Sequence, residues 1–260
     1  MLFTALLALA SVFLPTGLEA RDPFQRTTPP DLIRMGSLIP ANRAGIAFSN
    51  FELHEHEIFL RRRTGALFAE YAFGDVASIS ASVPYTVKHQ TDVETREHVD
   101  NINLALRFAH GRRDWRPVYG LDAFLATGSD EAGIGSRLLG NLVPYGGAVY
   151  FGGSFSFAAI LRWNTQTNNQ FQEDENVRFQ RTWLIELAAG WSWDALEIFL
   201  EYERKIRYAP KENRLNTSVF APGLNYRFGE KFQLGVSIPY TTSKEREFDA
   251  GIVIRGTYFY

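Results

Sequence analysis

The end of the chain, FDAGIVIRGTYFY (residues 248–260), alternates between two kinds of side chain. One face of the predicted strand is apolar and finishes on Tyr260, whereas the other face carries Asp249, Arg255 and Thr257. Because successive side chains of a strand point to opposite sides, this strand needs an apolar medium on one side and a polar one on the other. A transmembrane barrel supplies both, since lipid surrounds it and its lumen is polar. The segment therefore predicts an all-β, transmembrane antiparallel up-and-down β-barrel.

The totals of the chain agree with a single β domain. The chain has 260 residues, a formal net charge of −2 and no Cys. A nearly neutral chain offers no electrostatic reason to predict a nucleic-acid partner. The lack of Cys is typical of proteins exported to an oxidising compartment.

The N-terminal segment divides into two parts before the barrel. Residues 2–14 are apolar but shorter than the roughly 20 residues that a spanning helix needs. Residues 1–20 are predicted to be a secretory signal peptide, the alternative being a buried N-terminal helix. Residues 21–43 are Pro-rich and are predicted to be an irregular periplasmic leader, which forms either a plug or a disordered tail. The predicted barrel spans residues 44–260.

The same alternation repeats along the predicted barrel, with short and long connections in turn. Tight turns are expected at Gly74-Asp75, Gly152-Gly153, Trp193-Asp194 and Gly229-Glu230. Long polar stretches lie between them and predict outer loops over residues 86–99, 128–143 and 164–180. An additional first strand is expected within residues 44–60, where ELHEHEIFLRRR breaks the alternation and leaves its register open. The total is about twelve strands, with short turns in the periplasm and both termini there.

Aromatic side chains are predicted to form two belts, one at each end of the strands, as in proteins that sit in a membrane. In a soluble β-sandwich, the alternative fold, the aromatic rings would point into a shared core and would not form two belts. The belt at the tight turns contains Phe73, Phe108, Trp115, Phe151, Phe155, Trp191, Phe228, Phe232 and Tyr260. The belt at the long loops contains Tyr85, Trp163, Trp183, Tyr202, Tyr240 and Phe248.

Two hairpins of the chain align without gaps. EYAFGDVASISASVPYT (residues 70–86) matches NYRFGEKFQLGVSIPYT (residues 225–241), including Pro84 with Pro239. We expect each Pro to end inter-strand pairing where the strand leaves the bilayer. This hairpin resembles the outer-membrane family named for the phenol meta-cleavage degradation pathway, whose members are labelled transporters. The resemblance implies a barrel of about twelve strands that takes up small, often hydrophobic molecules.

Charged residues on the presumed inner faces are the candidate lumen or pore-lining residues. Buried charges of both signs need partners, so one interpretation is an ion-pair network that packs the lumen and fixes register. The other is a polar track beside a constriction that selects solutes. The Glu197, Glu201 and Glu203 strand favours cations or neutral solutes. The candidates are Glu70, Arg107, Asp122, Arg162, Glu186, Glu197, Glu201, Arg227 and Arg255.

Other chemistry has weaker support. His54 and His56 share a strand face and have a spacing that fits a metal ion, but no third ligand is apparent, so an exposed strand end is the simpler interpretation. The Ser residues on presumed lumen faces have no His in matching phase, so no catalytic residue and no cofactor is predicted.

The predicted function is passive or facilitated passage of small molecules, including hydrophobic ones, across the bacterial outer membrane. Lateral release of hydrophobic cargo is a variant, and the alternative is a closed structural or surface-interaction barrel whose outer loops bind partners. The predicted partners are the lipid bilayer, an unidentified small-molecule cargo, and the barrel-insertion machinery, reached through the C-terminal aromatic strand.

Overall fold

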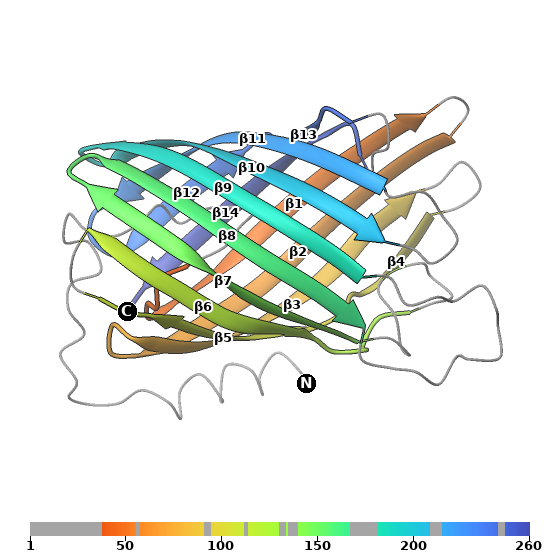
Figure 1. The fold of residues 1–260 in the computed structure, drawn as a ribbon. Helices are drawn as coiled ribbons and strands as arrows, with labels where there is room; N and C mark the ends of the chain where they lie inside the picture. The colour runs from red at the N-terminus through yellow and green to blue at the C-terminus, as the bar shows by residue number, and fades with distance from the viewer. Residues whose placement is uncertain are drawn as a thin grey trace.

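A computed structural model describes residues 38–55, 58–90, 95–111, 114–129, 134, 140–166, 181–208, 215–243 and 248–260. These residues form one sheet of fourteen strand segments that curves into a cylinder (Figure 1). The segments are β1 (Arg43–Glu55), β2 (Ile58–Phe73), β3 (Ala77–Gln90), β4 (Thr95–Val99), β5 (Asn103–Ala109), β6 (Trp115–Phe124), β7 (Asn141–Gly152), β8 (Phe155–Gln166), β9 (Arg181–Trp193), β10 (Leu196–Tyr208), β11 (Leu215–Phe228), β12 (Phe232–Ser237), β13 (Tyr240–Thr241) and β14 (Ala250–Phe259).

The sheet closes because its first and last strands pair. β1 is antiparallel to β14 from Arg43 opposite Phe259 to Glu52 opposite Ala250. β4 and β5 both pair with β3, and β12 and β13 both pair with β11, so each couple is one interrupted strand. The fourteen segments therefore make a closed antiparallel barrel of twelve strands, which confirms the predicted fold class.

The predicted tight turns are confirmed at one end of the barrel. Gly74, Gly153, Asp194 and Gly229 all adopt positive φ, at 72°, 63°, 53° and 65°. A left-handed residue lets two antiparallel strands join in a short connection, and Gly adopts this conformation without steric cost. The C-terminus lies at this same end in Figure 1. By the usual arrangement of such barrels, this is the periplasmic end.

The outer surface is apolar along the strands. Leu104, Leu187 and Leu234 are exposed by 40%, 36% and 42%, whereas the residues beside them, such as Ala105 and Ala188, are 3% exposed. An isolated barrel in water would gain nothing by this arrangement, but in a bilayer the exposed apolar face contacts lipid. The predicted outward and inward phases are therefore correct at these positions. No helix among the described residues is long and apolar enough to cross a membrane.

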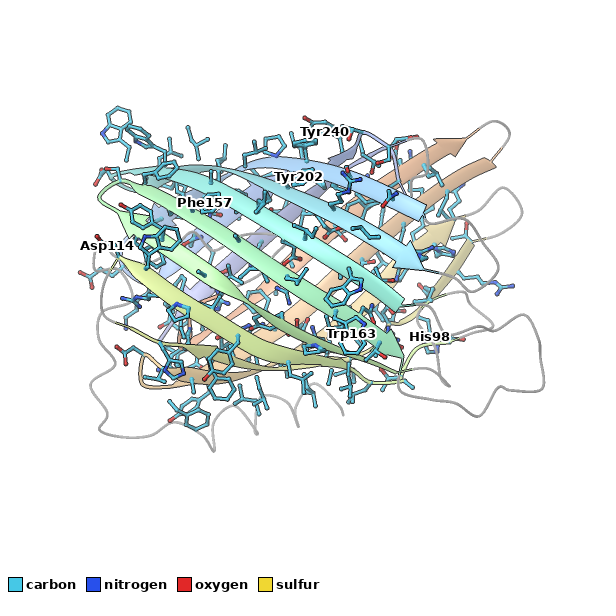
Figure 2. The ribbon with its side chains drawn as sticks, in the orientation of Figure 1. His98, Asp114, Phe157, Trp163, Tyr202 and Tyr240 are labelled. Carbon is cyan, nitrogen blue, oxygen red and sulfur yellow. The ribbon has the colours of Figure 1, made fainter. Side chains whose placement is uncertain are left out.

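Aromatic residues lie toward both ends of the barrel. Trp163 lies near the loop end and stacks on Trp183 with ring centroids 5.8 Å apart, and Asp114 marks the opposite end (Figure 2). At the turn end, Trp115 contacts Tyr150 with centroids 5.0 Å apart. The predicted belt position of Phe151 is wrong, because Phe151 packs against the buried inner cluster. Its neighbour Tyr150 faces outward instead, since one step along a strand reverses the face.

Three further expectations were wrong in detail. The predicted outer loop 86–99 is largely strand, since β3 continues to Gln90 and β4 begins at Thr95. The predicted loop 128–143 ends earlier than expected, because β7 already begins at Asn141, and within this loop Ser129 bridges the fully buried Ile134. The leader ends one residue earlier than expected, because Arg43 already belongs to β1.

The two matching Pro residues also behave differently from the expectation. Pro84 lies inside β3 and is paired with Ala66, and β3 continues beyond it. The neighbouring strand is interrupted at this level, between β4 and β5. Pro239 lies in the gap between β12 and β13, after which pairing resumes at Tyr240. Because Pro has no N–H to donate, each Pro marks a local interruption of the ladder and not its end.

We expect Leu104→Arg and Leu200→Arg each to destabilise the folded barrel by about 2–4 kcal/mol, because they place a charge near the middle of the lipid-facing surface. Urea-induced unfolding in phospholipid vesicles measures this change. Glu230→Arg, in the exposed β11–β12 turn, is the matched control and should change stability by less than about 0.5 kcal/mol. Equal effects at all three positions would contradict the assigned lipid-facing surface.

Candidate functional site in the barrel lumen

The candidate residues lie on the inward-facing sides of their strands. Five carboxylates among them are buried, whereas the four Arg residues are partly buried. Arg227, for example, follows the outward Tyr226, which is 44% exposed, and shares its face with Asn225, which is 2% exposed. The buried carboxylates are Glu70, Asp122, Glu186, Glu197 and Glu201.

The first ionic group surrounds Glu70. Register pairing places Arg43 of β1 directly opposite Glu70 of β2, and their side chains form an ion pair of 2.7 Å between Nη2 and Oε2. Arg107 of β5 approaches the same oxygen at 3.3 Å, and the Ser78 hydroxyl of β3 donates to the other oxygen. Four strands are therefore linked through one carboxylate that faces two guanidinium groups. Such charge-assisted bonds compensate a carboxylate that is almost fully desolvated.

The second ionic group surrounds Arg162 of β8. Its Nε donates to Glu186 of β9 at 2.7 Å, and its Nη1 donates to Asp122 of β6 at 2.5 Å. The guanidinium also lies over the ring of Tyr145, its register partner on β7, with 4.5 Å from Cζ to the ring centroid. One guanidinium group here pairs with two carboxylates, whereas around Glu70 two guanidinium groups pair with one carboxylate.

Tyr145 fits beside Arg162 because Gly120 lies directly opposite it. A Cβ atom on Gly120 would come within 2.5 Å of the Tyr145 hydroxyl oxygen. Three other inward-facing aromatic residues also lie over a glycine that is their direct cross-strand partner. The pairs are Phe68 with Gly45, Phe199 with Gly223 and Phe51 with Gly251. The glycines let these rings lie against the barrel wall, which leaves space in the lumen.

A third polar group is separate from the first two. Asn225 of β11 donates to Glu197 of β10 at 2.9 Å, and the Ser192 hydroxyl lies 3.4 Å from the other carboxylate oxygen. Glu201, further along β10, is 2% exposed. These residues and Arg227 do not line the chamber described next.

A chamber of about 390 Å³ lies between the two ionic groups. It brings together six of the predicted residues, and it adds Arg43, Phe68, Phe124, Asn103 and Asn164. Its charged lining consists of Arg43, Arg107, Arg162 and Arg255 against Glu70, Asp122 and Glu186, which leaves one positive charge in excess. Arg255 lies over the Phe68 ring at 5.1 Å from the centroid. The lining therefore combines charged groups, amides and aromatic faces.

Sequence reasoning missed several of these lining residues for identifiable reasons. Arg43 was assigned to the leader, although its spacing from Gly45 and Ala47 continues the inward phase of β1. Phe68 and Phe124 were missed because the search for a polar lumen selected charged side chains. Their inward phase, shared with Glu70 and Asp122 respectively, was the available signal.

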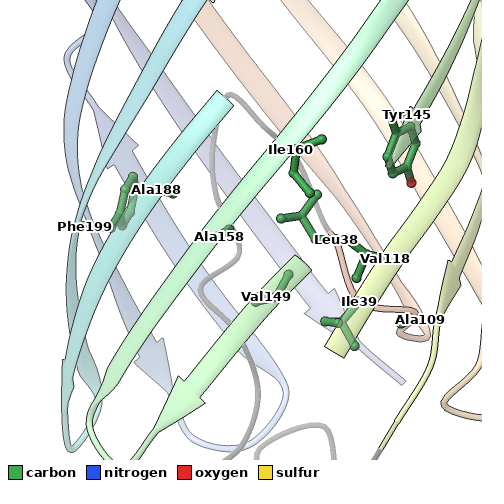
Figure 3. Packing of buried hydrophobic residues seen from close by; sticks show 10 residues of the cluster. All are labelled: Leu38, Ile39, Ala109, Val118, Tyr145, Val149, Ala158, Ile160, Ala188 and Phe199. Carbon is green, nitrogen blue, oxygen red and sulfur yellow. The ribbon is translucent and has the colours of Figure 1, made fainter. Parts of the chain in front are cut away.

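Toward the turn end, the segment before β1 enters the lumen. Leu38 and Ile39 are 3% and 8% exposed and belong to a cluster of inward-facing apolar residues (Figure 3). The cluster includes Val118, Val149 and Ile160, from β6, β7 and β8. Two large side chains of the segment therefore occupy the lumen at this level. Residues 1–37 lie outside the described residues, so the signal peptide and the rest of the leader remain predictions.

The described side chains offer no alternative site for a metal. No group of three or more His, Asp or Glu among them could hold a metal ion. The possible ligand pair at His54 and His56 lies outside the part of the chain whose side chains the structure describes.

The closed sheet, its lipid-facing exterior and its charged interior define an outer-membrane β-barrel, located in the bacterial outer membrane and in contact with its lipid bilayer. Residues 70–255 match the model of the family described as "Putative MetA-pathway of phenol degradation". This match covers more than half of the chain, so the protein belongs to that family. The resemblance carried by the two matching hairpins is thereby confirmed.

Solved structures share the fold at low sequence identity. An outer membrane channel from Pseudomonas putida F1 is 13% identical and has a TM-score of 0.70, with 89% of this chain and 99% of that chain covered. The NanC porin is 8% identical with a TM-score of 0.61, and the coverage is 84% of this chain and 99% of the porin. The KdgM porin is 10% identical with a TM-score of 0.54, covering 83% and 99%. No curated protein matches the chain.

We expect Arg162→Gln to destabilise the barrel by about 3–5 kcal/mol, because it leaves Asp122 and Glu186 buried and uncompensated. Adding Asp122→Asn and Glu186→Gln to this variant should recover part of the loss. Unfolding in urea, followed by the gel shift between folded and unfolded barrel, measures both. Strictly additive losses across the three substitutions would contradict the shared ionic group, since residues of one network are expected to couple.

Proposed function

We propose that this protein is a passive, non-enzymatic outer-membrane channel that admits small solutes through the chamber in its lumen. The observation that carries the proposal is the chamber itself. A barrel that serves only as a scaffold has no need of a cavity of about 390 Å³ lined by charged and amide side chains. Cavities of this size with a few converging polar groups are typical of small-molecule sites. Family membership and the shared fold of channels and porins support the same class.

The charge of the chamber favours small anions and neutral solutes over cations. The expectation of cation preference rested on Glu197, Glu201 and Glu203, of which Glu197 and Glu201 are buried and none lines the chamber. The chamber lining has four guanidinium groups and three carboxylates. Rings of charged side chains set the ion preference of a pore, and those of the chamber have one positive charge in excess.

Leu38 and Ile39 restrict this route at the periplasmic side. Both residues belong to an apolar cluster with Val118, Val149 and Ile160. Neighbouring Asn42 fixes the end of the segment, because its side-chain oxygen accepts a hydrogen bond from the Ala72 N–H at 2.8 Å. The segment acts as a partial plug, and the conductance of the channel is correspondingly small.

We expect Leu38→Ala combined with Ile39→Ala to raise single-channel conductance in planar bilayers, because it removes apolar bulk from the lumen. Ile46→Ala is the matched control: it removes an aliphatic side chain that is 62% exposed on the outer face, and it should leave conductance unchanged. A silent bilayer for both the wild type and the double variant would favour the alternative, a closed structural or surface-interaction barrel. A reversal potential that indicates cation preference in a KCl gradient would contradict the assigned role of the chamber.

Lateral release of apolar cargo through the barrel wall into the bilayer is a second candidate function. The interruptions of the ladder favour it, because regular pairing breaks at Pro84, beside the gap between β4 and β5, and at Pro239, between β12 and β13. Single backbone bonds, such as Asp100 N–H to the Pro84 oxygen and Gly251 N–H to the Pro239 oxygen, bridge these places. Fewer inter-strand hydrogen bonds must break there for the wall to separate.

Pro239→Ala tests this second candidate, because it restores a backbone N–H at the interruption. We expect slower uptake of an apolar fluorescent probe into proteoliposomes, with ion conductance unchanged. Pro117→Ala, in the uninterrupted strand β6, is the control. Unaltered probe uptake in the Pro239 variant would count against lateral release. It would not affect the channel proposal, which conductance tests separately.

The predicted contact with the barrel-insertion machinery belongs to the same proposal. β14 presents Ile254 and Tyr258 outward, and Tyr260 follows it directly; each is exposed by about 40% or more. This C-terminal strand is also the one that must find β1 to close the barrel. We propose that the insertion machinery recognises the unfolded chain through this outward aromatic face.

A further inference from the structure

On the outer face of β1, β2 and β3, an apolar row of paired residues is followed by a row that contains two basic residues. Register pairing places Phe48, Gly65 and Tyr85 in one outward row. The next outward row, on the side away from the tight turns, consists of Asn50, Arg63 and Lys88. Tyr85 belongs to the aromatic belt, which marks the headgroup level of a membrane. Lys88 pairs with Arg63, which lies two residues beyond Gly65, so this row is about 7 Å farther from the tight turns and lies among the headgroups of the outer leaflet.

A β-bulge places Lys88 on this outer face. Thr64 pairs with Thr86 on the inner face, where their hydroxyls are 3.2 Å apart and Thr86 is fully buried. The register then shifts, so that Arg63 pairs with Lys88 and Val87 is the extra residue. Without the shift, Arg63 would face Val87, and Lys88 would point into the lumen. Bulges commonly re-aim a side chain in this way.

The bulge creates a direct cross-strand pair of two cations. Such a pair is destabilising unless an anion lies between the two groups. Arg63 donates to the Asn50 side chain at 3.2 Å, which leaves its charge without a carboxylate in that contact. In the following row, Glu52 is already engaged by Arg61 at 2.7 Å.

Lys88 has no ion pair among the described residues. Glu97, outward on β4 opposite the bulge, makes none with it in that part of the chain. Among the side chains that the structure describes on this face, Arg61, Arg63 and Lys88 stand against Glu52 and Glu97, an excess of one positive charge. The patch is therefore suited to an anion supplied from outside the protein.

We propose that Arg63 and Lys88 bind a phosphate group of the glycolipid that forms the outer leaflet. The level of the patch, its outward direction and its excess charge all match a phosphorylated lipid headgroup, and basic groups at a membrane surface attract anionic headgroups. Phe48 and Tyr85, in the row beneath, would contact the upper part of the acyl chains. This inference concerns the outer surface and does not depend on the lumen being a channel.

The test is thermal unfolding of the purified barrel in detergent, titrated with diphosphorylated lipid A and, separately, with dephosphorylated lipid A. We expect the wild type to gain stability with the phosphorylated form, because a ligand that binds the folded state stabilises it. Lys88→Gln should weaken this binding by about fivefold, and adding Arg63→Gln should bring the loss to roughly 30-fold. The single variant keeps the test informative if the double variant folds poorly, because Lys88 has no ion pair to lose among the described residues.

Arg204→Gln is the matched control for this titration. Arg204 is a single outward base next to Tyr202, and its cross-strand partners Ile185 and Ser218 are uncharged. It should bind the phosphorylated lipid as the wild type does. Equal affinity of the Lys88 variant and the wild type would overturn the proposal, and so would equal binding of the dephosphorylated lipid. Full stabilisation by inorganic phosphate alone at the same concentration would likewise overturn the assignment to a lipid.

Discussion

The hydrogen-bonded seam between β1 and β14 is the interaction on which the rest of the structure depends. Lipid offers no partner for an unpaired backbone group, so a sheet that crosses a membrane must have no free edge. Here the first and last strands of the barrel pair over ten successive residues of β1, from Arg43 to Glu52. Once this seam closes, one face of every strand contacts hydrocarbon and the other is enclosed in the lumen. The apolar exterior and the charged interior are two consequences of the same closure.

Closure also brings together charges that are far apart in the sequence. Arg43 and Arg107 meet at Glu70, and Asp122 and Glu186 meet at Arg162, which is possible because neighbouring strands place these residues on adjacent inner positions. Each group has an unequal ratio of charges, and the two groups face a common chamber. The network therefore holds strands together and borders a polar space, while the selection of solutes by that space stays a prediction.

Space inside the barrel depends on small residues as much as on charged ones. A twelve-stranded barrel has a narrow interior, and several large aromatic side chains point into it. Each of Phe51, Phe68, Tyr145 and Phe199 lies over a glycine that is its direct partner across the ladder. Side chains larger than hydrogen at these positions would push the rings toward the axis. The segment with Leu38 and Ile39 then occupies part of the remaining lumen, so the open route is set by packing and not by barrel size alone.

The sequence by itself determined the period-two pattern, the tight turns, and therefore the fold class, the membrane-facing surface and the inward face of each candidate residue. These features are local, since they follow from the alternation of neighbouring residues and from Gly or Asp at the turns. Phe151, Pro84 and the bulge at Arg63 and Thr64 could not be placed in this way, because a shift of one residue reverses the face and the partner strand decides the register. Only the tertiary structure decided that Arg43 joins Glu70, that Arg162 serves two carboxylates and that Leu38 lies in the lumen. Those contacts join residues distant in the chain, and no local pattern records which strands become neighbours at the same height.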